Sequence, residues 1–132
     1  MLRYMLKSKL HQARVTSADL YYEGSLTIDK DLMEAADIIE FEKVHVVNIN
    51  NGERFETYVI PGDRGSKVIG LNGAAARKGA AGDQVIIITY TALEDKELDK
   101  YKPIIILLDE KNEIKDIDNK VKEETIGMTN GN

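Results

Sequence analysis

The chain has 132 residues, no cysteine and a formal net charge of −5 at pH 7. This length fits one domain with a single core, the lack of cysteine excludes disulfides, thiolate metal sites and a cysteine nucleophile, and the acidic balance disfavours nucleic acid and anionic membranes as partners. Residues 1–6 are too short for a signal peptide and no apolar run reaches the ~20 residues of a membrane span, so we expect a cytoplasmic protein.

Short β-strands are predicted at the start of the chain, over residues 2–6 and 11–16, where apolar and polar residues partly alternate. Within one extended segment Lys7, Lys9 and His11 would point to the same face, because side chains alternate along a strand. Three nitrogen-bearing side chains could then line one surface. A solvated strand face is the alternative interpretation.

The dipeptide Gly24-Ser25 follows the run Tyr21-Tyr22-Glu23. A serine directly after a glycine in a sharp bend can attack its own backbone. The Ser25 hydroxyl would add to the Gly24 carbonyl and form an ester, and elimination followed by hydrolysis would leave a pyruvoyl group at the start of a new chain. An ordinary turn leading into a strand at residues 26–28 is the simpler interpretation of this dipeptide taken by itself.

A short helix is predicted from Asp29 to Ala36, with Asp29 as its N-cap and a structural role. Two strands follow, over residues 44–49 and 54–60, and Asn50-Asn51-Gly52 between them is typical of a tight hairpin turn. The only other histidine, His45, lies in the first of these strands without a motif around it, which favours a structural role.

The second hairpin strand carries two sets of side chains on opposite faces. One set is Arg54, Glu56 and Tyr58, and the other is Phe55, Thr57 and Val59. If Thr57 and Tyr58 serve one site, the strand must twist or border a cleft. A rim charge and a half-buried strand aromatic are the plain alternatives for Arg54 and Tyr58.

Pro61-Gly62 is predicted to end this strand, and another short strand is expected over residues 68–71. The next five residues have little bulk: Asn72-Gly73-Ala74-Ala75-Ala76. They suit the start of a helix capped by Asn72. They equally suit a turn where a ligand reaches backbone N–H groups, since a helix N-terminus favours a carboxylate.

The last third of the chain is predicted to begin with a central strand over residues 84–89, which is an apolar β-branched run. A short charged helix is expected over residues 92–100 and a strand over 103–108. The chain is polar beyond Asp109, so a mobile tail is expected over about residues 119–132.

Four of these segments together resemble the bacterial pyruvoyl-dependent aspartate 1-decarboxylases. They occur in that family's order and spacing, and the match is clear over about the first ninety residues and weaker after Thr89. The segments are Lys9-Leu10-His11, Ala18-Asp19-Leu20-Tyr21-Tyr22-Glu23-Gly24-Ser25, Asn51-Gly52-Glu53-Arg54-Phe55-Glu56-Thr57-Tyr58 and Asn72-Gly73-Ala74-Ala75-Ala76.

The resemblance implies a mainly-β fold, a six-stranded double-psi β-barrel with short helices, formed by residues 1–132 as a single domain. It also implies a homotetramer with active sites between subunits, and an inactive proenzyme that cuts itself between Gly24 and Ser25. The products would be chains 1–24 and 25–132. Gly24 would be glycine because a strained or positive-φ backbone brings the hydroxyl onto the carbonyl and a Cβ would obstruct it.

The activity implied by the resemblance is decarboxylation of L-aspartate to β-alanine and carbon dioxide, which supplies pantothenate and coenzyme A biosynthesis. Ser25 would become the pyruvoyl group that forms a Schiff base with the substrate, in the electron-sink role that pyridoxal phosphate has elsewhere. Neither pyridoxal phosphate nor a metal is then expected. Tyr58 would be the proton donor, since a tyrosine with a pKa of about 10 is protonated at neutral pH.

Further roles carried over from the family concern self-cleavage and substrate binding. Thr57 would hydrogen-bond the Gly24 carbonyl during cleavage. Arg54 suits a bidentate grip on a carboxylate, whereas Lys9 offers a mobile point charge. The complete substrate-binding set is Lys9, Arg54, Thr57, Gly73, Ala74 and Ala75, and the supporting set is His11, Tyr22 and Asn72.

Two other functions stay open at this point. One is a non-catalytic small β-barrel binding module with the Gly24-Ser25 bond uncut, which the net charge of −5 disfavours if the partner is nucleic acid. The other is a pyruvoyl decarboxylase of another amino acid. The two cations Lys9 and Arg54 favour a diacid substrate over a basic one.

Overall fold

The structure, a computed structural model, describes residues 1–118, so the mobile tail predicted for residues 119–132 lies outside the described residues. Strands dominate these residues, and the mainly-β class with short helices is confirmed. The strands are β1 (Leu2–Arg14), β2 (Ser17–Asp19), β3 (Ser25–Asp29), β4 (Lys43–Asn48), β5 (Arg54–Gly62), β6 (Ile69–Asn72), β7 (Gln84–Glu94), β8 (Ile104–Leu108) and β9 (Ile114–Asp118). The helices are α1 (Lys30–Ala35) and the 3₁₀ helices η1 (Gly73–Lys78) and η2 (Asp95–Glu97).

The strands form a sheet that closes on itself. Its order within residues 1–118 is β2-β6-β3-β5-β4-β7-β1-β8-β9. Only Val15 and Thr16 separate β1 from β2, and the Thr16 N–H continues the path by donating to the Ile69 carbonyl at 2.8 Å. Because β1 pairs with β7 while β2 pairs with β6, this bent segment joins the two ends of the run β6-β3-β5-β4-β7. The result is a barrel, whose double-psi topology stays a prediction.

The barrel interior is filled by fully buried aliphatic side chains from every wall. Leu10 of β1, Leu26 of β3, Val59 of β5, Leu71 of β6 and Ile87 of β7 are all 0% exposed. In β1, β5 and β7 these residues alternate with more exposed neighbours, as the period of two along a strand requires, whereas β6 is buried throughout.

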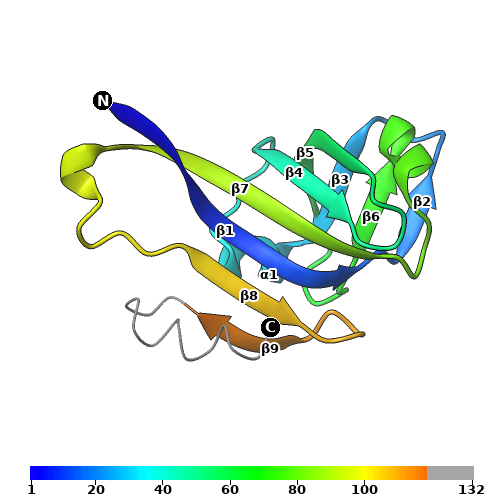
Figure 1. The fold of residues 1–132 in the computed structure, drawn as a ribbon. Coiled ribbons are helices and arrows are strands. Elements are labelled where there is room, and N and C mark those ends of the chain that lie inside the picture. Colours follow the sequence, from blue (N-terminus) through cyan, green and yellow to red (C-terminus); the bar gives the residue numbers. More distant parts are fainter. Residues whose placement is uncertain (119–132) are drawn as a thin grey trace.

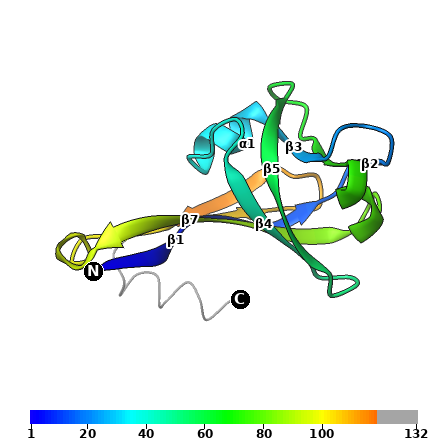
Figure 2. The ribbon, with the colours of Figure 1, turned by 90° about the horizontal axis from the view of Figure 1, so that it is seen from above.

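An arm extends from the barrel where β1 and β7 run antiparallel as far as the pair Leu2 and Glu94 (Figure 1). The view from above shows this arm projecting away from α1, β3 and β5 (Figure 2). Strand β8 pairs in parallel with β1, and β9 pairs with β8. Strand β9 was not predicted, because its own residues are mostly polar and exposed and only pairing with β8 makes it extended.

Several predicted element boundaries are wrong. Residues 2–6 and 11–16 are not separate strands, because β1 runs unbroken from Leu2 to Arg14 through two irregularities in its register with β7. Pro61 and Gly62 do not end β5 but pair with Ile28 and Asp29 of β3. Strand β4 pairs with β5 only as far as Tyr58, so the missing N–H of Pro61 costs no hydrogen bond on that side.

The helix predicted over residues 92–100 is also wrong. Strand β7 continues to Glu94 because residues 91–94 pair with the start of β1, and only the three residues of η2 are helical. Long-range pairing here outweighs the local preference of a charged segment.

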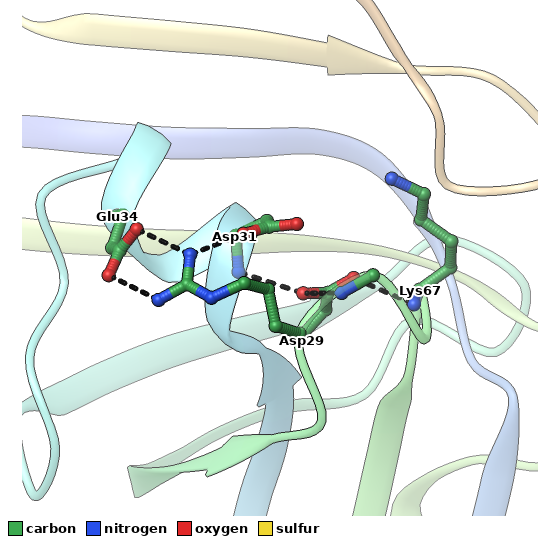
Figure 3. Close-up of polar contacts among 6 residues, drawn as sticks. Asp29, Asp31, Glu34 and Lys67 are labelled. Atoms are coloured by element: carbon green, nitrogen blue, oxygen red, sulfur yellow. Dashed lines mark hydrogen bonds and ion pairs between the residues drawn. The ribbon is translucent and has the colours of Figure 1, made fainter.

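Helix α1 begins as predicted, with Asp29 as its N-cap. The carboxylate of Asp29, which is fully buried, accepts hydrogen bonds from the backbone N–H groups of Asp31 (2.8 Å), Gly65 (3.0 Å) and Lys67 (2.7 Å) (Figure 3). Burial by itself would raise the pKa of Asp29, but these N–H donors hold it below its ordinary value. Asp29 thereby fixes the end of β3 against the connection between β5 and β6.

Candidate active site

Ser25 is the first residue of β3 and is only 1% exposed. It lies opposite Asn72 of β6, whose side-chain amide donates to the Ser25 Oγ at 3.0 Å and to the Thr27 Oγ1 at 2.8 Å. The Ser25 hydroxyl donates to the Glu23 carbonyl at 3.3 Å. The hydroxyl is thus held in one place, beside the peptide bond that precedes it.

The prediction that Asn72 caps the following helix is wrong. Its side chain makes no capping hydrogen bond to η1, because both amide hydrogens point to the hydroxyls of β3. Asn72 therefore belongs to the surroundings of Ser25, as its predicted supporting role requires.

The prediction that Gly24 has a strained or positive-φ backbone, where a Cβ would be obstructed, is wrong as well. The glycines with positive φ in the described residues are Gly52, Gly65, Gly73 and Gly82, and Gly24 is not among them. A Cβ added at Gly24 would meet its nearest atom, the Asn72 carbonyl oxygen, at 4.0 Å, which is ordinary contact. Neither backbone strain nor crowding within this chain explains a glycine at position 24.

Thr57 and Tyr58 come next to Gly24 and Ser25 through the parallel pairing of β3 with β5. The pairing begins at Leu26 with Val59, and Ser25 and Tyr58 are the residues directly before this first pair, with Gly24 and Thr57 one position earlier. Thr57 is half-buried and Tyr58 is 37% exposed. The sequence places these two residues on opposite faces of β5, and this register shows how both can border one short segment.

The ring of Phe41 contacts the ring of Tyr58, with centroids 6.2 Å apart and planes inclined by 52°. Phe41 has a φ of +72°, and its N–H donates to the Val59 carbonyl at 2.7 Å. Sequence reasoning missed Phe41. No pattern marks it, because a left-handed aromatic residue in a connection has no periodicity of its own.

The small residues after Asn72 form the start of η1, with Gly73 and Ala75 buried and Ala74 exposed. Arg54 begins β5, four residues before Tyr58, and its side chain is exposed. These residues share the end of the barrel where β3 begins. The described contacts therefore bring together five of the predicted site positions in one chain, and Thr57 and Tyr58 directly precede the first β3–β5 pair. The five are Tyr22, Gly24, Ser25, Asn72 and Gly73.

Lys9 does not join them within the chain. It lies on β1 opposite Ile88 of β7 and Ile105 of β8, and its buried neighbours Ser8 and Leu10 show that it points away from the core. Around the barrel wall, four strand-to-strand steps through β5, β4 and β7 separate β3 from β1, an arc of about 19 Å. Within residues 1–118, Lys9 makes no hydrogen bond or ion pair with any of these site residues.

His11 follows Lys9 on the same strand, opposite Leu107. Burial and the charge of Lys9 both lower the pKa of His11, and its Nδ1 has no hydrogen-bond partner. Lys7 differs from both, since its ammonium is paired with Glu42 at 2.6 Å. Of the three side chains predicted to share a face, Lys7 is therefore engaged in an ion pair.

A cavity of about 640 Å³ lies elsewhere, on the outer face of β1, β7, β4 and β5. It contains none of the predicted site residues, and its lining is Tyr4, Lys43, Val44, His45, Glu56, Tyr90, Thr91 and Ala92. The buried hydroxyl and its donor lie at the start of β3, so we place the candidate site there.

In residues 1–118 no helix is long and apolar enough to cross a membrane, and no three His, Asp or Glu side chains are grouped to hold a metal.

Comparison with known proteins gives a family match over nearly all of the described residues. The family model described as "Aspartate decarboxylase" matches residues 1–115. A protein named "Aspartate 1-decarboxylase" from Syntrophomonas wolfei is 62% identical over 117 residues, which are 89% of this chain and 99% of that protein.

Two further relatives carry the same name. The one from Cupriavidus necator is 59% identical over 117 residues, 89% of this chain and 98% of its own length. The one from Heliobacterium modesticaldum is 60% identical over 114 residues, 86% of each chain. The similarity therefore extends well beyond Thr89, where the motifs in the sequence weaken.

Proposed function

The chain belongs to the aspartate decarboxylase family and is a carboxy-lyase, and from this premise we propose that it converts L-aspartate to β-alanine and carbon dioxide with a pyruvoyl group made from its own Ser25. The observation that carries the proposal is the buried hydroxyl of Ser25, the residue directly after Gly24. This hydroxyl accepts a hydrogen bond from Asn72. An ordinary turn serine would be solvated, whereas this one is held beside its own peptide bond.

Self-cleavage uses atoms of the chain alone. Attack of the Ser25 Oγ on the Gly24 carbonyl carbon closes a five-membered ring, and breakage of the C–N bond, with the hydroxyl proton passing to nitrogen, leaves an ester. Removal of the Ser25 Hα then breaks the Cβ–Oγ bond and frees the Gly24 carboxylate. The remaining enamine takes up water and releases ammonia, which leaves the ketone.

Two neighbours support this reaction. The Thr57 hydroxyl, which lies two residues before the first β3–β5 pair as Gly24 does, would donate to the oxygen on which negative charge develops. The Asn72 amide holds the Ser25 oxygen at 3.0 Å and so restricts the attacking atom before reaction.

The residues at the start of β3 fit a pyruvoyl group, since the serine that would form it is buried between the Asn72 side-chain amide and the Glu23 carbonyl. Such a group supplies a carbonyl that condenses with the substrate amine and accepts the electrons released when the α-carboxylate leaves. Tyr58, beside Ser25 in the extended register, would deliver a proton to the former α-carbon.

Substrate binding needs cations for two carboxylates. Arg54 would supply a planar fork for one of them, and the backbone of Gly73, Ala74 and Ala75 would line the remaining wall. Lys9 would supply the second cation, but it lies four strand-to-strand steps from β3. The other route runs through Asn72 and Asp19 and then back ten residues along the chain to Lys9, through the bend between β1 and β2.

This separation supports the proposal that Lys9 and His11 reach the site of a neighbouring subunit in a homotetramer. Exposed apolar side chains on the arm, namely Leu2, Tyr4 and Tyr90, offer surface for such an assembly.

The mass of the purified chain tests the proposal. Wild-type protein should give two species, residues 1–24 and residues 25–132 beginning with a ketone instead of a serine. Ser25→Ala should give one uncut species without β-alanine production. A wild-type chain that stays intact after prolonged warming, with a free Ser25, would sink the pyruvoyl proposal.

A further inference from the structure

Gly73 makes the closest backbone approach to the scissile segment. Its φ is +63°, and a Cβ built on it would lie 2.7 Å from the Gly24 Cα, 2.7 Å from the Gly24 nitrogen and 2.8 Å from the Tyr22 carbonyl oxygen. These distances are at least 0.6 Å short of the 3.4 Å at which ordinary contact begins. All three atoms belong to the backbone, so no side-chain rotation can relieve the collision.

The approach joins two segments that are distant in sequence. Gly73 follows Asn72, which is paired with Ser25 across β3 and β6, so its position is set by the barrel wall. The segment from Tyr22 to Gly24 is exposed on its other side. Because Gly73 is fixed by the barrel wall and the Tyr22–Gly24 segment is exposed, a side chain added at position 73 should displace that segment.

We propose that Gly73 is a positioning residue for self-cleavage, because its lack of a side chain allows the Tyr22–Gly24 backbone to lie where the Gly24 carbonyl meets the Ser25 hydroxyl. This inference rests on the proposed function and assigns the glycine requirement to position 73. It explains why Gly24 is neither strained nor crowded although the bond after it is the reactive one.

The expected defect lies in cleavage, since the reacting atoms are displaced while the barrel stays intact. A Cβ at position 73 must push the loop by at least about 0.6 Å, and misplacement of reacting groups on the order of 1 Å costs about 100-fold in rate. We therefore expect Gly73→Ala to cleave about 100-fold more slowly than the wild type.

Two glycines provide matched controls. Gly52 also has positive φ, +77°, but a Cβ there would meet nothing within 4 Å, so Gly52→Ala tests strain without collision. Gly79, at the other end of η1, would bring a Cβ to 2.8 Å from a Leu71 methyl and 2.9 Å from the Asn48 amide, so Gly79→Ala tests collision away from Ser25. Both controls should cleave within about threefold of the wild type.

The experiment follows intact mass over time for freshly purified wild type and the three alanine variants. Gly73→Asn is measured too, because asparagine tolerates positive φ better than alanine and keeps the colliding Cβ. The same substitutions in a Ser25→Ala background report on folding by circular dichroism. The proposal is supported if both position-73 variants fold but cleave slowly while Gly52→Ala and Gly79→Ala cleave normally.

Three results would overturn it. One is wild-type cleavage by Gly73→Ala. Another is slowing of Gly52→Ala or Gly79→Ala to the same extent, which would show a general loss of stability. The third is failure of both position-73 variants to fold, since the Cβ would then disrupt the barrel itself. Failure of the proposed function is separate, because it appears as an uncut wild-type chain.

Discussion

Asp29→Asn tests how the end of β3 is anchored. The substitution keeps one oxygen, which can still accept from Asp31 and Gly65, but it puts an NH₂ group against the Lys67 N–H, which now donates to the Oδ2 at 2.7 Å. One hydrogen bond to a charged acceptor is lost, worth about 1.5–3 kcal/mol, and a buried donor is left without an acceptor, at about 1–3 kcal/mol. Because these overlap, we expect a loss of about 3 kcal/mol in the free energy of unfolding.

The measurement is urea unfolding followed by far-ultraviolet circular dichroism in a Ser25→Ala background, which gives one covalent species. Protein concentration is held constant, because assembly makes apparent stability depend on it. In a thermal scan the same loss corresponds to about 10 °C for a chain of this length. Glu34→Gln is the matched control on α1, since its exposed carboxylate pairs with Arg64 at the surface and should contribute little.

The stabilisation by Asp29 should depend on pH in a defined direction. The pKa of Asp29 is lowered in the folded protein, so its contribution is complete above the unfolded value of about 3.9 and is lost as pH falls through the folded value. The difference between wild type and Asp29→Asn should be constant from pH 5 to 8 and shrink below about pH 4. Equal stabilities at pH 7, or a difference that grows on acidification, would refute the anchoring role.

Substitutions at three further positions probe the site and the barrel. Tyr58→Phe should still cleave but lose most β-alanine production, and wild-type turnover would remove Tyr58 from the donor role. Phe41→Asn should lower kcat about threefold at unchanged KM by removing a ring contact of about 0.5–1.5 kcal/mol, while Phe41→Tyr should retain wild-type kcat. Asn112→Ala should cost about 3 kcal/mol in urea unfolding, because the buried Asn112 side chain bonds the Arg14 N–H and the carbonyls of Arg14 and Lys67. Asn112→Gly should recover about 1 kcal/mol of this loss, since φ is +60° there.

Local signals predicted the elements whose geometry is local. The turn at Asn50-Asn51-Gly52 has its glycine at a φ of +77°, and Asp29 caps α1 as its residue type indicates. The failures share one cause, which is pairing between distant segments. Strand β7 extends to Glu94 because β1 lies beside it, and β5 passes through Pro61 because β3 pairs with it there.

The candidate site shows the same contrast between local signals and pairing of distant segments. Its residues could be grouped from the sequence only through a resemblance, because the parallel register of β3 with β5 spans more than thirty residues and leaves no periodic signal. Thr57 and Tyr58 precede the first pair of that register just as Gly24 and Ser25 do. Phe41 escaped even the resemblance, since its contribution is a ring contact made from a connection between elements.

The contrast between Gly24 and Gly73 links the proposed cleavage to folding. Sequence reasoning places the need for a glycine at the scissile bond, yet the close approach occurs at a residue 49 positions further along the chain. Asn72 and Gly73 reach Ser25 and Gly24 only when β6 is paired with β3. An unfolded or nascent chain contains the dipeptide without these restraints, so under the proposed function the peptide bond would become reactive only once the barrel has closed.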